Sequence, residues 1–246
     1  MKTQDQKSVL AEKRIIILGG SSGIGLATAH AAASEGAKVT IVSGKQQRID
    51  AALEGLPEGV QGFAVNLGNE QAIKAFFEQA GSFDHLTYSA GENLTLTMLD
   101  NVIIDEARQF FNVRYWGAVA TVKYAAKNIN AGGSINLIGG IAGPRPSAGW
   151  AIAASICSAM EGFTRAMAVE LAPVRVNLVS PGVIKTNLWN GMSEADREAI
   201  FTNVANSLPL KRVGNAEDIA QTFIYMMKQQ FATGQVITVD GGAVLV

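Results

Sequence analysis

The sequence predicts a single α/β domain with a doubly wound, mostly parallel sheet of about seven strands and helices on both faces. Short apolar segments rich in β-branched residues alternate along the chain with longer segments of helical periodicity. No repeat or polar linker interrupts this alternation, and a chain of 246 residues that is 48% hydrophobic suits one large domain. Residues 1–246 are therefore assigned to one domain, whose ligands should bind beyond the carboxyl ends of the strands.

The first predicted strand, Arg14–Leu18, runs directly into a glycine-rich turn and then a helix over 26–34. Glycine permits a sharp turn and a close approach to a pyrophosphate, while the N–H groups and dipole of a new helix favour negative charge. This position inside a βαβ unit predicts a dinucleotide site, although a glycine turn without a ligand is the alternative. The turn residues expected to bind are Gly19, Ser21, Ser22, Gly23, Ile24 and Gly25.

Six further strands follow from the same pattern, with helices between them. They are predicted near 38–43, 60–65, 83–89, 133–138, 175–179 and 235–239. Two long helices, over about 104–128 and 151–172, carry apolar stripes that should pack mostly on the sheet and partly against another subunit. Residues 1–12 are expected to form a flexible extension, and residues 184–210 a substrate lid with a helix around 193–205.

Composition and charge exclude several classes of protein. A formal net charge of -1 gives no electrostatic footprint for nucleic acid or an anionic membrane. No apolar run approaches the ~20 residues of a membrane span, and the polar residues 1–8 lack a signal sequence, so a cytoplasmic location is expected. One cysteine, Cys157, and two histidines, His30 and His85, offer no metal cluster, and the histidines are interpreted as surface or packing residues.

Four further segments carry a resemblance to a known family. They are Ser-Ala-Gly at 89–91, Ser-Pro-Gly-Val-Ile-Lys-Thr at 180–186, the helix start at 212–220 and the closing strand at 234–242. With the glycine turn, they make the chain resemble the short-chain dehydrogenase/reductases over essentially its whole length. The resemblance implies a Rossmann-like fold, a nicotinamide dinucleotide and a carbonyl/alcohol oxidoreductase. It also implies cofactor contacts from Ser89, Ala90, Gly91, Ile138, Pro181, Gly182, Val183 and Thr186.

The end of the second strand bears on the type of cofactor. An NAD site needs a carboxylate there for the ribose 2′-hydroxyl, whereas a 2′-phosphate needs a cation and no carboxylate. This chain has Ser43, Gly44 and Lys45, which favours NADP(H) over NAD(H), unless Lys45 is simply a solvated residue. After the third strand, Asn66 stands where the family usually has Asp, and Asn66 and Leu67 are expected on the adenine side.

The catalytic residues of the family are replaced. By resemblance, a Tyr acts as general acid/base with a Lys four residues later, a Ser about 13 residues earlier and an Asn in the preceding helix. Aligned on residues 160–168, the Tyr and Lys positions hold Ala153 and Cys157, and the Ser position holds Gly140. Arg114 takes the Asn position, although nearby Asn112 is an alternative match. No Tyr-x-x-x-Lys sequence occurs anywhere in the chain.

Three functional hypotheses remain. The first is an NADP(H)-dependent oxidoreductase with an altered site, in which Tyr88 acts as acid/base and Arg114 lowers the pKa of Tyr88 or stabilises an oxyanion. The second is a catalytically silent nucleotide-binding subunit or NADPH sensor that acts through a protein partner. The third, a structural protein without cofactor, is disfavoured by the intact glycine turn and the Pro181-Gly182 segment.

Aromatic and apolar residues near the lid predict a substrate pocket for a small molecule. Trp150 precedes the helix that carries Ala153, and Trp189 and Met192 follow the Pro-Gly segment. These side chains either line an apolar pocket or fill it as core. By resemblance, the chain is also expected to form a homo-oligomer, a dimer or tetramer, through its two long helices, with a hetero-oligomer as the alternative.

Overall fold

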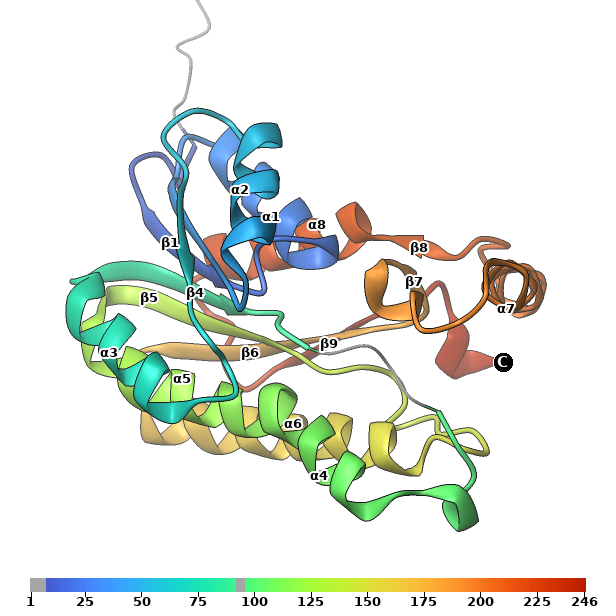
Figure 1. Ribbon diagram of the computed structural model, residues 1–246. Helices are drawn as coiled ribbons and strands as arrows, with labels where there is room; N and C mark the ends of the chain where they lie inside the picture. The colour runs from blue at the N-terminus through green and yellow to red at the C-terminus, as the bar shows by residue number, and fades with distance from the viewer. Residues whose placement is uncertain (1–7, 92–95) are drawn as a thin grey trace, which may run out of the picture.

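A computed structural model describes residues 8–91 and 96–246. Its main sheet has seven strands in the order β3-β2-β1-β4-β5-β6-β9, and every neighbouring pair is parallel. Helices cover both faces of this sheet (Figure 1). The predicted fold class is confirmed. The strand order reverses between β1 and β4, and this reversal is where such sheets bind their ligands.

The strands lie close to the predicted ranges, and the central ones, β1, β4 and β6, are short runs of almost entirely buried residues, whereas β3 at the sheet edge is mostly exposed. Their bounds are β1 (Arg14–Leu18), β2 (Lys38–Ser43), β3 (Gln61–Ala64), β4 (Phe83–Tyr88), β5 (Ile129–Ile138), β6 (Arg175–Pro181) and β9 (Val236–Val239). Strand β5 begins earlier than predicted, since Ile129 pairs with Phe83 ahead of an irregularity in the register.

The helices form a layer on each side of the sheet (Figure 1). One layer contains α1 (Gly23–Ser34), α2 (Gln46–Gly55) and α8 (Ala216–Lys228). The other contains α3 (Glu70–Ala80), α4 (Ile104–Phe111), α5 (Ala118–Ala125) and α6 (Ala151–Glu170). Each layer buries its own apolar cluster against one face of the sheet. Short 3-10 turns, η1 (Leu99–Asn101) and η5 (Ala243–Leu245), lie outside these layers.

The helix predicted over 104–128 is interrupted. Between α4 and α5 the chain makes one π-helical turn, η2 (Asn112–Gly117), and the helix ends in a 3-10 turn, η3 (Ala126–Asn128). A Cβ on Gly117 would lie 2.5 Å from the Tyr88 hydroxyl oxygen and 2.4 Å from the Leu67 carbonyl oxygen. The Tyr88 hydroxyl donates a hydrogen bond to the Val113 carbonyl inside this turn. The last residue of β4 therefore holds the π-helical turn in place.

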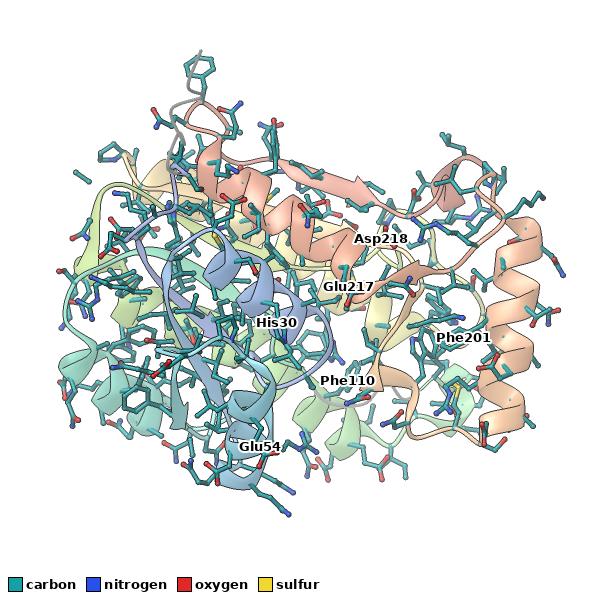
Figure 2. The ribbon with its side chains drawn as sticks, turned by 90° about the horizontal axis from the view of Figure 1, so that it is seen from above. His30, Glu54, Phe110, Phe201, Glu217 and Asp218 are labelled. Carbon is teal, nitrogen blue, oxygen red and sulfur yellow. The ribbon has the colours of Figure 1, made fainter. Side chains whose placement is uncertain are left out.

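Residues 184–210, the segment that the sequence predicts to be a substrate lid and that is called the lid below, have a small core of their own. The lid contains β7 (Ile184–Lys185), η4 (Asn187–Trp189) and α7 (Glu194–Ser207), and β7 pairs with β8 (Gly214–Asn215). The Ser193 hydroxyl caps α7 by accepting from the Asp196 backbone N–H at 3.2 Å. Trp189 and Phe201 meet edge to face in a cluster with Val213, and Phe201 points from α7 toward the body of the domain (Figure 2).

The chain after β8 is fixed by a charged cap at the start of α8, where Figure 2 shows Glu217 and Asp218. The Arg212 guanidinium makes two hydrogen bonds to the Asp218 carboxylate, at 2.7 and 2.8 Å. Asp218 also accepts from the Asn215 backbone N–H, which completes a capping box. The Arg212 hydrogen bonds, followed by the Asn215 bond, lower the pKa of Asp218 to about 2.

The expected flexible extension over 1–12 differs from the structure at Ser8–Glu12, while residues 1–7 lie outside the described part of the chain. Leu10 is fully buried among residues of β1 and β2. The Glu12 backbone N–H donates to the Gly36 carbonyl at 2.8 Å, and the Ser8 hydroxyl bonds to the Glu35 carboxylate. The buried Leu10 and these hydrogen bonds therefore hold residues 8–12 on the domain.

Candidate active site

The glycine-rich turn between β1 and α1 leaves no room for side chains. Gly19 has a φ of +87°, and a Cβ there would lie 2.6 Å from the Ala90 backbone nitrogen. A Cβ on Gly25 would lie 2.2 Å from the Gly19 carbonyl oxygen. Opposite the turn, the backbone N–H and hydroxyl of Ser89 donate to the Leu18 carbonyl at 2.8 and 3.1 Å. The backbone itself forms the cradle, as a pyrophosphate site requires.

The turn leads into the amino end of α1. Ser22 is the N-cap, and its side chain makes no capping hydrogen bond, so the first N–H groups of the helix keep their capacity for an anion. Gly23 follows with a φ of +52°, and a Cβ there would lie 3.3 Å from the Thr186 Cβ. Ile24 packs on the core beside α8. The segment after β6 therefore lies against the glycine turn, although the two are far apart in sequence.

The end of β2 forms the next wall of the cradle. The Ser21 hydroxyl donates to the Ser43 hydroxyl at 2.8 Å, which joins the glycine turn to β2. Gly44 has open space around it, since the nearest atom to a Cβ there is the Val65 carbonyl oxygen at 4.0 Å. Lys45 is the exposed N-cap of α2, and Arg48 is exposed in the first turn. Arg48 is not among the residues predicted from the sequence. Its position three residues after Lys45 already places two cations at the start of the same helix.

The other predicted cofactor residues lie at the same edge of the sheet. Asn66 shapes the loop after β3, where its side-chain oxygen accepts from the Gly68 N–H at 3.0 Å, and Leu67 is buried beside it. Ala90 and Gly91 follow β4, and Ile138 ends β5. Gly182 follows β6, and a Cβ there would lie 2.8 Å from the Asp240 Cα. The carboxyl ends of the parallel strands thus bring the predicted set together.

The positions that the resemblance assigns to catalysis also meet. A Cβ on Gly140 would lie 3.2 Å from the Cys157 Sγ, and Ala153 is buried one turn earlier on α6. The loop after β5 and the first half of α6 therefore face each other, as the proposed correspondence with the family's Ser, Tyr and Lys requires. Neither glycine nor alanine offers an acid or base.

Cys157 does not supply an acid or a base that works near neutral pH. Burial raises the pKa of the Cys157 thiol to about 11, against the smaller opposing effects of Arg114 and of the Gly143 backbone N–H. At neutral pH the side chain is therefore a thiol rather than a thiolate. A buried thiol is a weak nucleophile and a weak base, which makes Cys157 a packing residue of α6.

Arg114 brings a positive charge to the site. It lies in η2, and its Cζ is 4.8 Å from the centroid of the Phe110 ring. A Cβ on Gly91 would lie 2.7 Å from both Cζ and Nη1 of Arg114, so the guanidinium covers the loop after β4. The charge of Arg114 acts to lower the pKa of both Tyr88 and Cys157. The position that the resemblance assigns to Asn thus holds a cation beside Gly91.

Tyr88 is a structural residue. Its side chain is fully buried, and its hydroxyl is engaged with the Val113 carbonyl. Burial raises the pKa of Tyr88 well above its usual range, and the nearby Arg114 does not reverse this effect. The suggestion that Tyr88 acts as the acid/base is therefore corrected, because its proton is committed to the backbone and shielded from a substrate.

An apolar cavity of about 440 Å³ adjoins these positions. Its apolar lining comes from the segment after β4, the loop after β5, the segment after β6, the lid and the last residues of the sequence: Leu96, Ile141, Trp150, Val183, Trp189, Ile200, Val204, Leu208, Ala243 and Val246. Trp150 and Trp189 line it as predicted. Met192 does not, because it packs on the lid cluster around Phe201. Ile141 and Val183 are neighbours of Gly140 and Gly182, so the cavity opens beside the proposed cofactor crevice.

Comparison with known proteins assigns the family. Residues 6–246 match the family model described as an SDR-like Rossmann domain. The chain belongs to the short-chain dehydrogenase/reductase family. It is 31% identical over 256 residues to the short-chain dehydrogenase/reductase fsr5 of Gibberella fujikuroi, covering 97% of each chain.

Two solved structures of this family are similar over nearly the whole chain. A small-chain dehydrogenase in complex with NADPH is 34% identical, with a TM-score of 0.86 over 96% of this chain and 100% of that one. The MalC reductase/Diels-Alderase from Malbranchea aurantiaca is 26% identical, with a TM-score of 0.90 over 98% of this chain and 99% of that one. The family members to which this chain is similar therefore include oxidoreductases and an NADPH-bound protein.

Other kinds of site are not found in the part of the chain that the structure describes. Residues 8–91 and 96–246 contain no group of three His, Cys, Asp or Glu that could hold a metal ion. Within the same residues, no helix is long and apolar enough to cross a membrane. His85 is buried, with Nδ1 2.9 Å from the Ser134 hydroxyl, and His30 is partly exposed on α1 (Figure 2).

Proposed function

We propose that this chain is an NADP(H)-dependent reductase of carbonyl-type substrates that works without the family's Tyr and Lys. One juxtaposition carries the proposal: the backbone cradle around Gly19 and Gly25 is complete, and an apolar cavity opens beside it. The cradle fits a dinucleotide because a Cβ at either glycine would collide with neighbouring backbone, so the turn stays bare and a pyrophosphate can come close to its N–H groups. The NADPH-bound relative supports the same cofactor class.

The preference for NADP(H) over NAD(H) rests on the end of β2. Ser43, Gly44 and Lys45 provide a hydroxyl, open space and a cation where an NAD site would have a carboxylate. Arg48 adds a second cation one helical turn later, and its backbone N–H bonds to the Lys45 carbonyl at 3.1 Å. Two cations at the start of α2 suit a 2′-phosphate.

Arg114 is the residue that we propose acts on the substrate. A bound nicotinamide dinucleotide would supply hydride. As the carbonyl carbon accepts it, negative charge develops on the substrate oxygen, and the Arg114 guanidinium is placed to stabilise that charge. Gly140 and Ala153 carry no acidic group, so solvent water supplies the proton for this oxygen in the proposed reaction.

Without a positioned acid, the rate of reduction should depend strongly on the type of carbonyl substrate. Proton transfer by a positioned acid is typically worth ~10² to 10⁴ in rate. Acceptors whose reduced form is a weakly basic anion depend least on that contribution. A conjugated ketone that takes the hydride at its β-carbon is such an acceptor, because the negative charge on its oxygen is then that of an enolate and not of an alkoxide. The relative named a reductase/Diels-Alderase supports a cavity that acts by orientation, since a cycloaddition requires no proton transfer.

The proposal is tested by binding and by turnover. NADPH should quench or shift protein fluorescence at micromolar concentration, and NADH should bind much more weakly. NADPH oxidation should then be faster with conjugated ketones than with simple ketones, and Arg114→Ala should slow it by about tenfold or more. Arg165→Ala, at an exposed arginine on α6 paired with Glu161, is the matched control. Equal rates for Arg114→Ala and the control would exclude this role of Arg114.

A second function is favoured by Ala153 and Cys157. With no titrating group at these positions, the chain can serve as a catalytically silent nucleotide-binding subunit or an NADPH sensor that acts through a protein partner. NADPH binding without turnover on the whole panel, together with an NADPH-dependent change in association with a partner, would support this function over the first.

We also propose that the chain forms a homo-oligomer, a dimer or a tetramer, with a hetero-oligomer as the alternative. Large apolar side chains are exposed on the helices named by the resemblance: Ile104 on α4, Trp116 on η2 and Val169 on α6. Exposed apolar surface of this kind is typical of subunit contacts. Light scattering of the purified chain gives the mass directly, and a monomer at all concentrations would contradict this proposal.

A further inference from the structure

The loop between β5 and α6 presents one arginine to the cavity in a constrained position. Arg145 stands between Pro144 and Pro146, which fix φ at their own positions and restrict the residue before them. The Arg145 backbone N–H also donates to the Ile141 carbonyl at 2.8 Å. The backbone that carries this side chain therefore has little freedom to lose when a ligand binds.

Arg145 is the charged member of the cavity wall. Among the lining residues in the described part of the chain, the other polar side chains are Ser147 and Ser207. Within residues 8–91 and 96–246, no carboxylate pairs with the Arg145 guanidinium. The carboxylate of Asp240, near the cavity, accepts instead from the backbone N–H groups of Gly242 and Val244, both at 2.8 Å. Arg145 thus adds a positively charged side chain to a wall that is otherwise mostly apolar.

The rest of the wall suits an apolar body. Trp189 is buried, and its indole N–H donates to the Ile184 carbonyl at 2.9 Å, so the ring offers the cavity only apolar surface. Val204 and Leu208 from the lid and Trp150 add further apolar side chains to the wall. A volume of about 440 Å³ falls within the range of pockets for small organic ligands.

We propose that this cavity binds organic anions with an apolar body, and that Arg145 holds the anionic group at the mouth. The inference rests on the proposed reductase function and names its substrate class: an apolar carboxylate or a similarly charged compound whose carbonyl lies toward Gly140 and Arg114. An arginine recognises such a group by charge-assisted hydrogen bonds, while the tryptophans and aliphatic side chains bury the hydrocarbon. Arg145 is then a specificity-determining residue.

A pair of fluorescent probes tests this without knowledge of the substrate. Anilinonaphthalene sulfonate and uncharged phenylnaphthylamine share one ring system and differ in the anionic group. Both are titrated into the full chain with saturating NADP⁺, which keeps them out of the dinucleotide crevice. Arg145→Ala should weaken sulfonate binding by about fivefold or more and leave the neutral probe within twofold. Arg145→Lys should restore most of the sulfonate affinity.

Two further variants locate the probes. Val204→Trp fills the cavity and should weaken both. Arg108→Ala changes the arginine of the separate shallow hollow formed with Ile104 and Trp116, and should change neither. Unchanged sulfonate binding in Arg145→Ala, or loss in Arg108→Ala instead, would overturn the inference. NADPH titration of the wild type and of each variant separates the two proposals. A wild-type protein that binds no NADPH would contradict the proposed function. The probe series tests only whether Arg145 binds the anionic group.

Discussion

The replacement Tyr88→Phe separates a structural tyrosine from a catalytic one. Phenylalanine keeps the ring that fills the core and removes only the hydroxyl. That hydroxyl is buried, donates to the Val113 carbonyl in η2 and lies where Gly117 leaves it space. If the structural role is correct, the variant should lose stability and keep its activity.

The size of the stability loss follows from this one hydrogen bond. Removing the donor leaves the Val113 carbonyl without its partner from β4, which costs about 1–2 kcal/mol of unfolding free energy. For a chain of this size, that corresponds to a fall in Tm of about 2–8 °C. If Tyr88 were the acid, its loss would instead lower turnover by ~10² to 10⁴.

Thermal unfolding, NADPH titration and turnover are measured on the same preparations. The matched control is Tyr225→Phe, because Tyr225 is about half exposed on α8, and its loss of a hydroxyl should leave Tm unchanged. We expect Tyr88→Phe to bind NADPH as the wild type does and to retain turnover within about threefold. A loss of turnover above a hundredfold at unchanged Tm would refute this account of Tyr88.

Three further predictions concern the cofactor cradle and the core. Gly25→Ala should abolish NADPH binding in a fluorescence titration, because the new Cβ would lie 2.2 Å from the Gly19 carbonyl oxygen. The control Gly55→Ala should bind NADPH as the wild type does, because a Cβ there has no atom within 4 Å. Gly44→Asp should move the preference from NADPH toward NADH by about tenfold or more, as measured by calorimetry, since it places a carboxylate beside Lys45. Burial lowers the pKa of His85 to about 4, from 6.5 in the unfolded chain. As the pH falls, the unfolded chain therefore binds the proton before the folded one does. Up to about 3 kcal/mol of unfolding free energy is lost between pH 6.5 and pH 4. Denaturant unfolding across this range should show that loss in the wild type and a smaller one in His85→Asn.

Much of the fold could be predicted because its signals are local. The run Arg14–Leu18 is buried from its second residue onward, so it has no polar alternation and reads as a central parallel strand. The turn that follows needs glycine at Gly19 and Gly25 for reasons of backbone geometry alone. Parallel strands then place all their carboxyl ends together, so the cofactor residues could be collected from separate segments without a structure.

Features that depend on long-range contacts could not be predicted. The π-helical turn η2 exists because Gly117 receives the hydroxyl of Tyr88 from another element, and a glycine inside a helical pattern does not reveal this. Leu10 lies in a short segment outside every predicted helix and strand, and its burial depends on contacts with residues of β1 and β2. Met192 and Trp189 are three residues apart, and only the fold of the lid decides which of them reaches the cavity.

The residues at the positions that the resemblance assigns to catalysis and Arg114 are best understood together. The position assigned to the lysine holds a neutral thiol, while a guanidinium reaches the same region from η2. Restoring Ala153→Tyr and Cys157→Lys would therefore put an ammonium near an existing cation in a buried position. Both effects lower the pKa of the new lysine, so it would be a poor partner for the tyrosine.

We therefore expect the double variant to gain little reductase activity with simple ketones. Adding Arg114→Asn removes the competing charge, and this triple variant should be the faster enzyme, with a pH profile that shows a titrating tyrosine. A double variant as active as the triple one would mean that Arg114 and residue 157 do not interact. In that case the charge of Arg114 would act on the substrate alone. The presence of Arg114 together with Cys157, at the position where the family has its lysine, would then be a coincidence.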